Sequence, residues 1–324
     1  MPHLPTAADV ADAARAIAGV ARRTPLLSSP ELDAIAGARI FLKPETLQQT
    51  GSFKFRGAYN RLSRLAGEDR QKGVVAVSSG NHAQGVALAG QMLGIPVTCL
   101  MPADSPAAKI ERTRRSGAEL VLFDRDSDDR YAMARDMTAR LGAVFVPPFD
   151  DFFIMAGQGT VGREIVEDLQ VMGVSPDAVL IPCGGGGLTA GCALAIHDLA
   201  PAAAVWTVEP EGFDDQARSF AAGERLSNAK TSGSICDGLL SPEPGELTFA
   251  VNRHQVADSL VVSDEEVKRA VAFAFHELKL VVEPSGAVAL AALLSGRVDV
   301  RDQTVAIVLT GGNVDAGLFA ELIG

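Results

Sequence analysis

The feature that most constrains the fold of this chain is a regular alternation of short apolar runs with longer amphipathic stretches. The alternation begins at Gly73 and continues to Val146. The apolar runs are predicted strands at 74–77, 97–101, 120–123 and 143–146, and the stretches between them are predicted helices at 83–93, 107–116 and 128–141. Because short strands that alternate with helices form parallel sheets covered on both faces, the segment predicts a compact α/β unit.

A second α/β segment follows Pro147-Pro148, which interrupt the alternation. Its predicted strands lie at 178–181, 205–208 and 304–309, and its predicted helices at 157–172, 188–199, 264–278 and 285–294. A helix is also predicted at 7–22 and a strand at 40–43, whereas 210–260 is rich in Gly, Pro and Ser and is predicted to be irregular. The sequence therefore predicts an α/β protein with two sheets and two domains, the larger from 1–68 and 147–324 and the smaller from 72–146.

Polar or glycine-rich motifs directly follow three of the predicted strands. These motifs are Ser78-Ser79-Gly80-Asn81-His82, Cys183-Gly184-Gly185-Gly186-Gly187-Leu188 and Thr310-Gly311-Gly312-Asn313. The first two open predicted helices, whose N-terminal N–H groups favour anions. Because ligands of parallel sheets bind at the carboxyl ends of the strands, the motifs predict one cleft between the two sheets.

The run of four glycines narrows the kind of anion that this cleft binds. A tight turn needs only one or two glycines, and the additional ones let the backbone approach a ligand closely. No Gly-Lys-Ser/Thr sequence follows, and the glycine spacing does not match a dinucleotide fingerprint. A single phosphate group is therefore the predicted ligand of Gly184–Gly187.

Lys54 is the first candidate for a reactive side chain. It lies in Ser52-Phe53-Lys54-Phe55-Arg56-Gly57-Ala58, at the start of a predicted helix for which Ser52 is the predicted N-cap. The positive end of the helix dipole disfavours an ammonium ion there, and a neutral lysine is a nucleophile. Taken alone, the segment favours a solvated lysine that tolerates a small penalty.

The four motifs together change that interpretation. They resemble those of the pyridoxal-phosphate enzymes related to serine/threonine dehydratases and serine racemase, and the resemblance covers nearly the whole chain. It implies the fold type II architecture, which is like that of the tryptophan synthase β chain. It implies that Lys54 holds pyridoxal phosphate as a Schiff base and that Gly184, Gly185, Gly186 and Gly187, with Leu188, bind the cofactor phosphate.

Further cofactor contacts come from the same resemblance. Asn81 is expected at the phenolic oxygen of the cofactor, and Thr310 at its pyridine nitrogen. Gly238 and Glu283 match family positions beside the cofactor. Phe53, which precedes the lysine, is expected to pack on the face of the cofactor ring, and a place in the core fits it equally well. Since a hydroxyl cannot hold a protonated pyridinium as an aspartate can, Thr310 favours elimination of a β-leaving group.

The residues expected to contact the substrate resemble serine racemases at one position and threonine dehydratases at others. By resemblance, the loop formed by Ser78, Ser79, Gly80, Asn81 and His82 binds the substrate carboxylate, although His82 is also interpreted as structural. Serine racemases have a serine at the position of Ser79 and use it as an acid and base on the face opposite the lysine.

Other segments resemble the threonine dehydratases instead. They are the residues from Gly80 to Val86 and Pro147-Pro148-Phe149-Asp150. Arg130 aligns roughly with an arginine that relatives use near the distal end of the substrate, which suits an acidic substrate. A solvated helix arginine is the simpler interpretation of Arg130.

A divalent-cation site is implied after the predicted strand at 205–208. Glu209, the carbonyl of Phe213 and Asp215 match the ligands of serine-racemase-like relatives. Oxygen ligands of this kind suit Mg²⁺, Ca²⁺ or Mn²⁺. The same residues fit a solvated acidic loop almost as well.

Composition excludes several other classes of protein. The chain has 324 residues, 47% hydrophobic residues and a net charge of −11, which argue for a substantial core and against nucleic acid or an anionic membrane surface as a partner. Its four cysteines have no CxxC spacing, no signal peptide or membrane-spanning run is visible, and a cytoplasmic location is expected. A homodimer is expected from the resemblance alone.

These observations predict a pyridoxal-phosphate-dependent ammonia-lyase that converts L-threonine or L-serine to a 2-oxo acid and ammonia. Serine racemase and threo-3-hydroxyaspartate dehydratase are the alternatives with the same fold. A nucleotide-binding protein without pyridoxal phosphate is a remote alternative that rests only on the glycine-rich turns.

Overall fold

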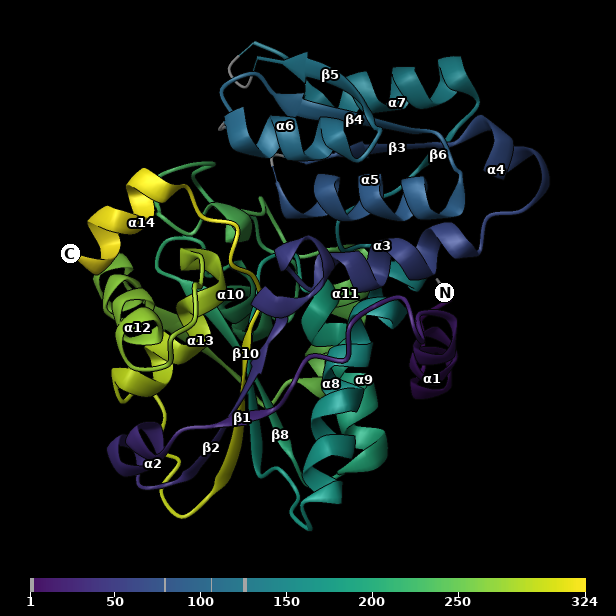
Figure 1. Ribbon diagram of the computed structural model, residues 1–324. Helices are drawn as coiled ribbons and strands as arrows, with labels where there is room; N and C mark the ends of the chain where they lie inside the picture. Colours follow the sequence, from purple (N-terminus) through teal and green to yellow (C-terminus); the bar gives the residue numbers. More distant parts are fainter. Residues whose placement is uncertain (1–2, 79, 106, 125–126) are drawn as a thin grey trace.

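The structure, a computed structural model, describes residues 3–78, 80–105, 107–124 and 127–324 (Figure 1). Within these residues the strands form two separate sheets. The helices are α1 (Ala7–Ala16), α2 (Pro30–Ala36), α3 (Lys54–Ser63), α4 (Gly67–Lys72), α5 (Asn81–Leu93), α6 (Ala107–Arg115), α7 (Arg130–Leu141), α8 (Phe152–Val171), α9 (Gly187–Leu199), α10 (Asp215–Ala222), α11 (Glu246–Gln255), α12 (Asp264–His276), α13 (Pro284–Leu294) and α14 (Ala316–Ile323). Short 3-10 turns occur at Glu45–Leu47, Gln49–Gly51 and Asp237–Leu239.

The larger sheet has six strands in the order β1-β2-β10-β7-β8-β9. Its strands are β1 (Leu27–Ser28), β2 (Arg39–Pro44), β7 (Ala178–Pro182), β8 (Ala204–Pro210), β9 (Asp258–Val262) and β10 (Thr304–Leu309). Only the β1–β2 pair is antiparallel among the pairs in this sheet. Alternate residues of β7 and β10 enter different cores, with Leu180 and Ile307 in one and Val179 and Val308 in the other. Both faces of this sheet are therefore buried, as the continuous apolar runs predict.

The smaller sheet is entirely parallel and has the order β5-β4-β3-β6. Its strands are β3 (Val74–Val77), β4 (Val97–Pro102), β5 (Glu119–Phe123) and β6 (Val144–Phe145). All four correspond to the strands predicted between Gly73 and Val146. This sheet lies above the larger one in Figure 1, with α5, α6 and α7 around it.

Helix α3 lies at the junction between the two sheets. It packs against α5 from the smaller sheet and against α8 from the larger one. On the larger sheet, α12 and α13 lie on one side and α8 and α9 on the other (Figure 1). Since α3 begins at Lys54, the junction places this lysine between the two sheets.

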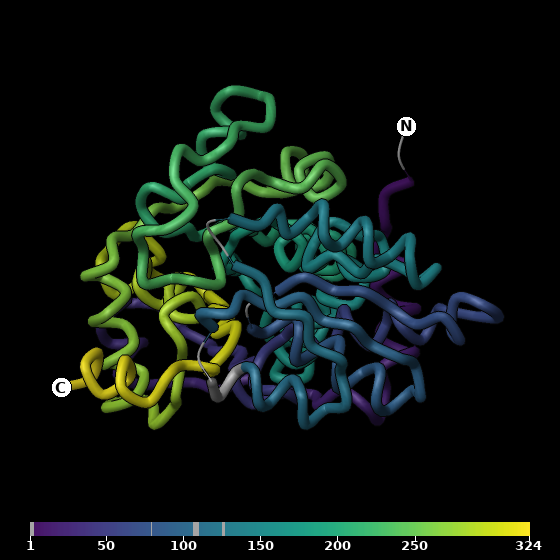
Figure 2. Tube along the Cα trace, turned by 90° about the horizontal axis from the view of Figure 1, so that it is seen from above, coloured from purple at the N-terminus to yellow at the C-terminus, as the bar shows by residue number. Residues whose placement is uncertain are grey.

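The prediction that 210–260 is irregular is wrong for much of the segment. It contains α10, α11 and β9, and β9 extends the larger sheet beside β8. The N-terminus of α11 is held by Asp150, whose carboxylate accepts hydrogen bonds from the N–H groups of Glu246, Leu247 and Thr248. A helix start that is capped from so far away in the chain carries no local signal. Figure 2 shows the residues before α11 extending from the body of the molecule.

Three other helix boundaries differ from those predicted from the sequence. The first helix ends at Ala16 rather than at residue 22, and α8 begins at Phe152 rather than at residue 157 because Asp151 caps it. Ser52 is not the N-cap of α3; it is extended and pairs with Gly311. The backbone position of Ser52 is set by β10 and the residues after it, which a local capping rule does not detect.

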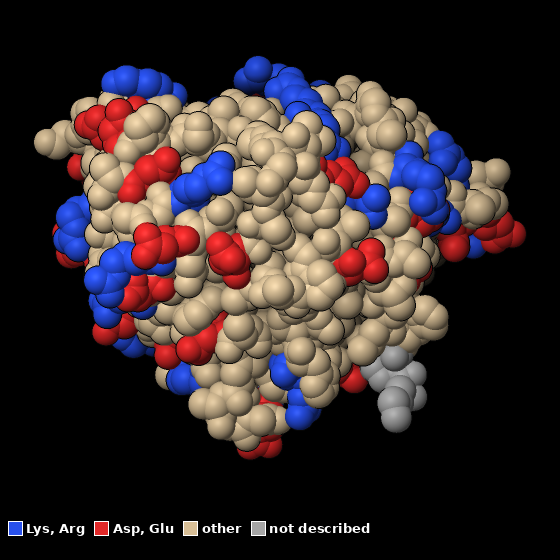
Figure 3. Space-filling view, turned by 90° about the horizontal axis from the view of Figure 1, so that it is seen from below, with Lys and Arg blue, Asp and Glu red and all other residues tan. Residues whose placement is uncertain are grey.

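Charged side chains are interspersed on the face that Figure 3 shows, where lysine and arginine alternate with aspartate and glutamate. No helix among the described residues is both long enough and apolar enough to cross a membrane.

Candidate active site

The lysine motif and the threonine motif form one wall of a pocket. The N–H of Phe53 donates to the carbonyl of Thr310 at 3.1 Å, and the N–H of Gly312 donates to the carbonyl of Gly51 at 3.0 Å. A side chain at Gly311 would meet Glu283 Oε1 at 2.2 Å, so this position requires glycine. Two motifs that are far apart in the sequence are thereby joined through their backbones.

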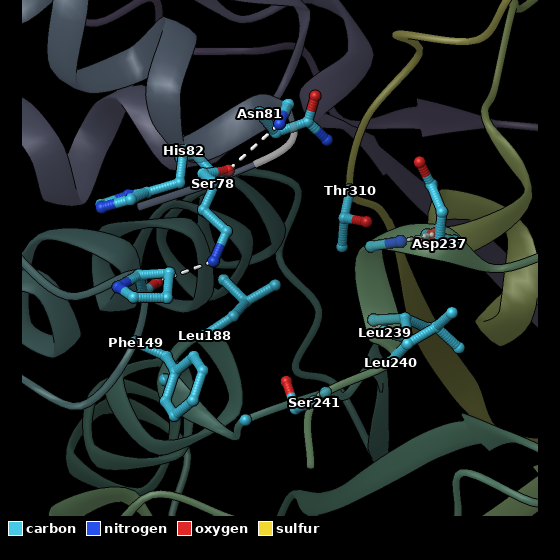
Figure 4. Close-up of a pocket in the computed structure, with 18 of the residues that line it drawn as sticks. Ser78, Asn81, His82, Phe149, Leu188, Asp237, Leu239, Leu240, Ser241 and Thr310 are labelled. Atoms are coloured by element: carbon cyan, nitrogen blue, oxygen red, sulfur yellow. Dashed lines mark hydrogen bonds between the residues drawn. The ribbon is translucent and has the colours of Figure 1, made fainter. Parts of the chain in front are cut away.

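The pocket is a cavity of about 190 Å³ between the two sheets. Ser78, Asn81 and His82 lie on one side of it, and Asp237 and Thr310 lie on the opposite side (Figure 4). Its lining includes all the described residues that the sequence predicts for cofactor and substrate, namely Phe53, Lys54, Ser78, Gly80, Asn81, His82, Arg130, Gly184, Gly185, Gly186, Gly187, Leu188, Gly238, Glu283 and Thr310. Ser79 lies outside the described residues.

The amine of Lys54 is partly buried in this pocket. Its Nζ donates to the carbonyl of Pro148 at 2.7 Å and lies 5.0 Å from the centre of the Phe53 ring. Burial lowers the pKa of Lys54 to about 8, because an ammonium ion is poorly solvated there. The cause is therefore desolvation rather than the helix dipole on which the sequence argument relied. A lysine with this pKa supplies much more neutral amine near neutral pH than a solvated lysine.

Arg56 anchors the helix that carries Lys54. Its guanidinium is fully buried, and it donates to both carboxylate oxygens of Glu45 and of Glu164. It also donates to the hydroxyl of Thr160 and the carbonyl of Arg22. Burial would lower the pKa of Arg56, but Glu45 and Glu164 together raise it above the ordinary value. This cation near a helix N-terminus is compensated by two carboxylates, which explains how the sequence tolerates it.

The glycine loop connects β7 to α9, and steric crowding explains its composition. A side chain at Gly185 would meet the ring of Phe149 at 2.4 Å, and one at Gly187 would meet Phe149 at 2.9 Å. Gly186 has a φ of 91°, which favours glycine. The loop ends at the N-terminus of α9, where unpaired N–H groups and the helix dipole attract an anion. This cradle fits a phosphate group.

The loop from Ser78 to His82 connects β3 to α5 on the facing wall. The Ser78 hydroxyl accepts a hydrogen bond from the N–H of Gly80 at 3.1 Å. His82 Nε2 lies 2.9 Å from the carbonyl of Val146, so this nitrogen carries the proton. Burial and the nearby Lys54 lower the pKa of His82 to about 3, and the imidazole is neutral. This geometry agrees with a structural role for His82.

The Asn81 side chain is held at both of its polar atoms. Its Nδ2 donates to Glu283 Oε1 at 2.6 Å, and its Oδ1 accepts from Asn313 Nδ2 at 2.8 Å. Asn313 in turn accepts from Arg112 Nη1 at 3.1 Å. Arg112 on α6 therefore contacts the last of the sequence motifs.

Arg130 is the first residue of α7, and it lines the pocket with Tyr131, Phe123 and Pro102. Its guanidinium lies 5.0 Å from the centre of the Tyr131 ring. A cation in the lining of the pocket provides a partner for a second carboxylate on a substrate.

Sequence reasoning missed several residues of the lining. They come mainly from the segment predicted to be irregular and from the residues beside β6, and they include Phe149, Asp237, Leu239, Leu240, Ser241 and Ser285. Ser285 positions one predicted residue, because its hydroxyl accepts the N–H of Gly238 at 2.8 Å. The only signal for Phe149 was its place in the Pro-Pro-Phe-Asp sequence, and the residues from 239 to 242 offer no motif.

Glu209 lies near the end of β8, Asp215 is the first residue of α10, and Phe213 lies between the two elements; none of the three lines the pocket. Glu209 accepts the N–H groups of Gln216 and Ala217 and the hydroxyl of Ser259. Asp215 Oδ2 is buried without a hydrogen-bond partner. The described residues contain no cluster of three or more His, Cys, Asp or Glu side chains that could hold a metal ion.

A partly buried lysine and a polar loop, beside a glycine cradle at a helix N-terminus and between the two sheets, are the arrangement expected of the pyridoxal-phosphate fold type II class. The chain belongs to this family: the family model described as pyridoxal-phosphate dependent enzyme matches residues 17–311. The family match overturns the alternative of a nucleotide-binding protein without pyridoxal phosphate.

Individual relatives match over almost the full chain. The L-threo-3-hydroxyaspartate ammonia-lyase of Pseudomonas sp is 44% identical over 97% of both chains. The L-threonine ammonia-lyase of Thermotoga maritima is 42% identical over 98% of this chain and 78% of its own length. The structure of maize serine racemase has a TM-score of 0.92 and 36% identity, and the match covers 98% of this chain and 97% of that one.

Proposed function

We propose that this chain is an ammonia-lyase that converts L-threonine or L-serine to a 2-oxo acid and ammonia. The observation that carries the proposal is the position of the Lys54 amine, which lines the same pocket as Ser78, Asn81 and His82. The ammonia-lyases among the relatives support it. Pyridoxal phosphate, when bound, supplies an electron sink for the α-carbon of the amino acid.

The residues of the chain then have distinct roles. Nζ of Lys54 removes the α-proton as general base, which its lowered pKa favours. Ser78, Asn81 and the N–H groups at the start of α5 bind the α-carboxylate. The cradle from Gly184 to Gly187 holds the phosphate. Movement of the smaller sheet and its helices, proposed as a separate domain, would exclude water from the cleft.

The function is tested by assaying purified protein for keto acid and ammonia. We expect 2-oxobutyrate from L-threonine and pyruvate from L-serine, each with an equimolar amount of ammonia. Absence of keto acid above the rate with free pyridoxal phosphate would refute the proposal. A chiral assay for D-serine in the same samples tests the racemase alternative, which rests on Ser79 and on the maize relative.

A second candidate substrate, L-threo-3-hydroxyaspartate, is favoured by Arg130. Arg130 lines the pocket, and the Pseudomonas relative acts on this compound. Its distal carboxylate would accept charge-assisted hydrogen bonds from Arg130.

Replacing Arg130 by methionine should change the substrate preference. We expect kcat/KM for hydroxyaspartate to fall about 10- to 100-fold, because a hydrogen bond to a charged group is lost, while that for threonine changes less than about 3-fold. Arg135→Met on the same helix is the matched control, since Arg135 is exposed and does not line the pocket. Equal losses for both substrates would rule out a selective role.

We also propose that Glu209, Asp215 and the Phe213 carbonyl bind a divalent cation. Burial and the charge of Asp215 raise the pKa of Glu209 to about 8. Burial also raises the pKa of Asp215 to about 7. Two buried carboxylates with raised pKa values and an unpaired oxygen fit a site that a cation neutralises.

Cation binding is expected to stabilise the protein in a pH-dependent way. Because both pKa values are raised in the folded state, protons stabilise it at low pH, and this stability is lost as the pH rises through about 7 and 8. Added Ca²⁺, Mg²⁺ or Mn²⁺ should therefore raise Tm by roughly 2–4 °C at about pH 8.5 and by less at about pH 6. Asp215→Asn should abolish the increase and the neighbouring Asp214→Asn should retain it, as scanning calorimetry after chelator treatment would show. A shift that survives Asp215→Asn would refute the site.

A further inference from the structure

Three consecutive carbonyls of the glycine loop are held by three different side chains from behind the pocket. Gln216 Nε2 donates to the carbonyl of Gly184 at 3.3 Å, and Thr248 Oγ1 donates to that of Gly185 at 2.6 Å. Asn252 Nδ2 donates to the carbonyl of Gly186 at 3.2 Å. All three side chains are fully buried, and none lines the pocket.

The three polar groups converge on one side of Gly186. A side chain at Gly186 would meet Asn252 Nδ2 at 2.7 Å, Gln216 Nε2 at 2.9 Å and Thr248 Oγ1 at 3.0 Å. Gly186 itself lines the pocket. The loop therefore has one side toward the pocket and a second side that is covered by hydrogen-bond donors.

The geometry of the peptide unit determines the direction in which the N–H groups of the loop point. In a trans peptide the carbonyl of one residue and the N–H of the next point in opposite directions. Donors that bind the carbonyls of Gly184, Gly185 and Gly186 from behind therefore turn the N–H groups of the three following residues toward the pocket. The N–H of Gly186 lies beside the thiol of Cys183, which also lines the pocket.

Charged groups fix the positions of these donors. The N–H of Gln216 donates to Glu209 Oε1 at 2.9 Å at the start of α10. Thr248 and Asn252 are one turn apart on α11, whose first N–H groups donate to Asp150 at 2.9–3.2 Å. The donors are thus preorganised before a ligand enters.

We propose that Gln216, Thr248 and Asn252 are positioning residues for the cofactor phosphate, which act by orienting the peptide groups of the glycine loop. The inference rests on the proposed function, in which this loop holds the phosphate. None of the three touches the ligand, and their effect is on the loop alone. Backbone donors also bind two of these carbonyls: the N–H of Gly245 donates to that of Gly185 at 3.2 Å, and the N–H of Ala190 to that of Gly186 at 2.9 Å. Loss of one side-chain donor therefore loosens a peptide group without releasing it, and this weakens the phosphate contact.

The test compares pyridoxal phosphate with pyridoxal, which lacks the phosphate. Apo-protein is titrated with each compound, and binding is followed by absorption. We expect Thr248→Val to raise Kd for pyridoxal phosphate roughly 10-fold and to leave Kd for pyridoxal within about 2-fold. Thr248→Ser keeps the donor and should behave like the wild type. Thr98→Val, a buried threonine on β4 of the other sheet, is the matched control for the loss of a hydroxyl.

Two results would overturn the inference. An equal rise in Kd for both compounds would show that Thr248 has only a structural role, and an unchanged Kd for pyridoxal phosphate would show that the loop needs no donor. Asn252→Leu and Gln216→Met repeat the test at the other two carbonyls. If the wild-type protein binds pyridoxal as tightly as pyridoxal phosphate, the proposed phosphate site itself fails. If the wild-type protein binds pyridoxal phosphate more tightly than pyridoxal, but the variants do not change the two Kd values as expected, the proposed function stands and this inference fails.

Discussion

Lys54→Ala is expected to lower turnover of threonine and serine by at least about 10³-fold, because the variant lacks both the covalent link to the cofactor and the general base. The amine of Lys54 lines the pocket, and its pKa of about 8 suits proton transfer near neutral pH. Added pyridoxal phosphate should still enter the pocket, since the glycine cradle remains. Activity should therefore stay low even with excess cofactor.

The measurement is kcat/KM for keto-acid release, with circular dichroism to confirm folding. Lys72→Ala is the control, because Lys72 is exposed on α4 and pairs with Glu68 at 2.8 Å. This control should keep wild-type activity. A Lys54→Ala protein that retained the wild-type rate would show that another group removes the α-proton.

Arg56→Met is expected to destabilise the protein by about 3–5 kcal/mol, because it leaves a buried carboxylate without its counter-ion. Glu45 is fully buried and depends on Arg56 for two hydrogen bonds at 2.8 Å. Burial would raise the pKa of Glu45, but Arg56 lowers it below the ordinary value. Without the arginine, Glu45 must either bind a proton or remain an unpaired charge.

Urea unfolding followed by the fluorescence of Trp206, the one tryptophan in the sequence, measures this loss. Arg56→Lys should also be destabilising, since an ammonium ion cannot reproduce the paired hydrogen bonds of a guanidinium. Arg114→Met is the control, because the exposed pair between Arg114 and Glu111 contributes at most about 1 kcal/mol. Similar stability for Arg56→Met and the wild type would contradict the anchoring role.

Much of the cleft was predictable because its residues follow strand ends. The polar and glycine-rich motifs after β3, β7 and β10 directly follow apolar runs, and parallel sheets bring such ends to one edge. The sequence could not show how the motifs are joined. The hydrogen bond between Phe53 and Thr310 depends on two segments that only the completed fold brings together.

The structure of the segment from 210 to 260, by contrast, could not be predicted from its sequence. Helix α11 begins at Glu246, and the N-cap residue Gly245 has no side chain to cap it, so Asp150 supplies the capping carboxylate from elsewhere in the chain. For the same reason, the sequence does not predict that Thr248 and Asn252 bind the carbonyls of the glycine loop. Long-range capping and burial determine the secondary structure of this region, and they cannot be inferred from local composition.

The partner of a buried charge is equally hidden in the sequence. A cation such as Arg56 is unfavourable near a helix N-terminus, yet Glu45 and Glu164 surround it. Likewise, the burial that lowers the pKa of Lys54 arises only in the assembled pocket and has no local signal in the sequence.

The most direct test of the account is to locate the cofactor on the chain. Holoenzyme is reduced with borohydride, digested and mapped by mass spectrometry, with its visible absorption recorded before and after reduction. The account predicts a visible band that reduction removes, and a single modified lysine at position 54 in the peptide that contains Phe53 and Phe55. A cofactor attached to any other lysine, or no attachment at all, would contradict the assignment of Lys54 on which the proposed function depends.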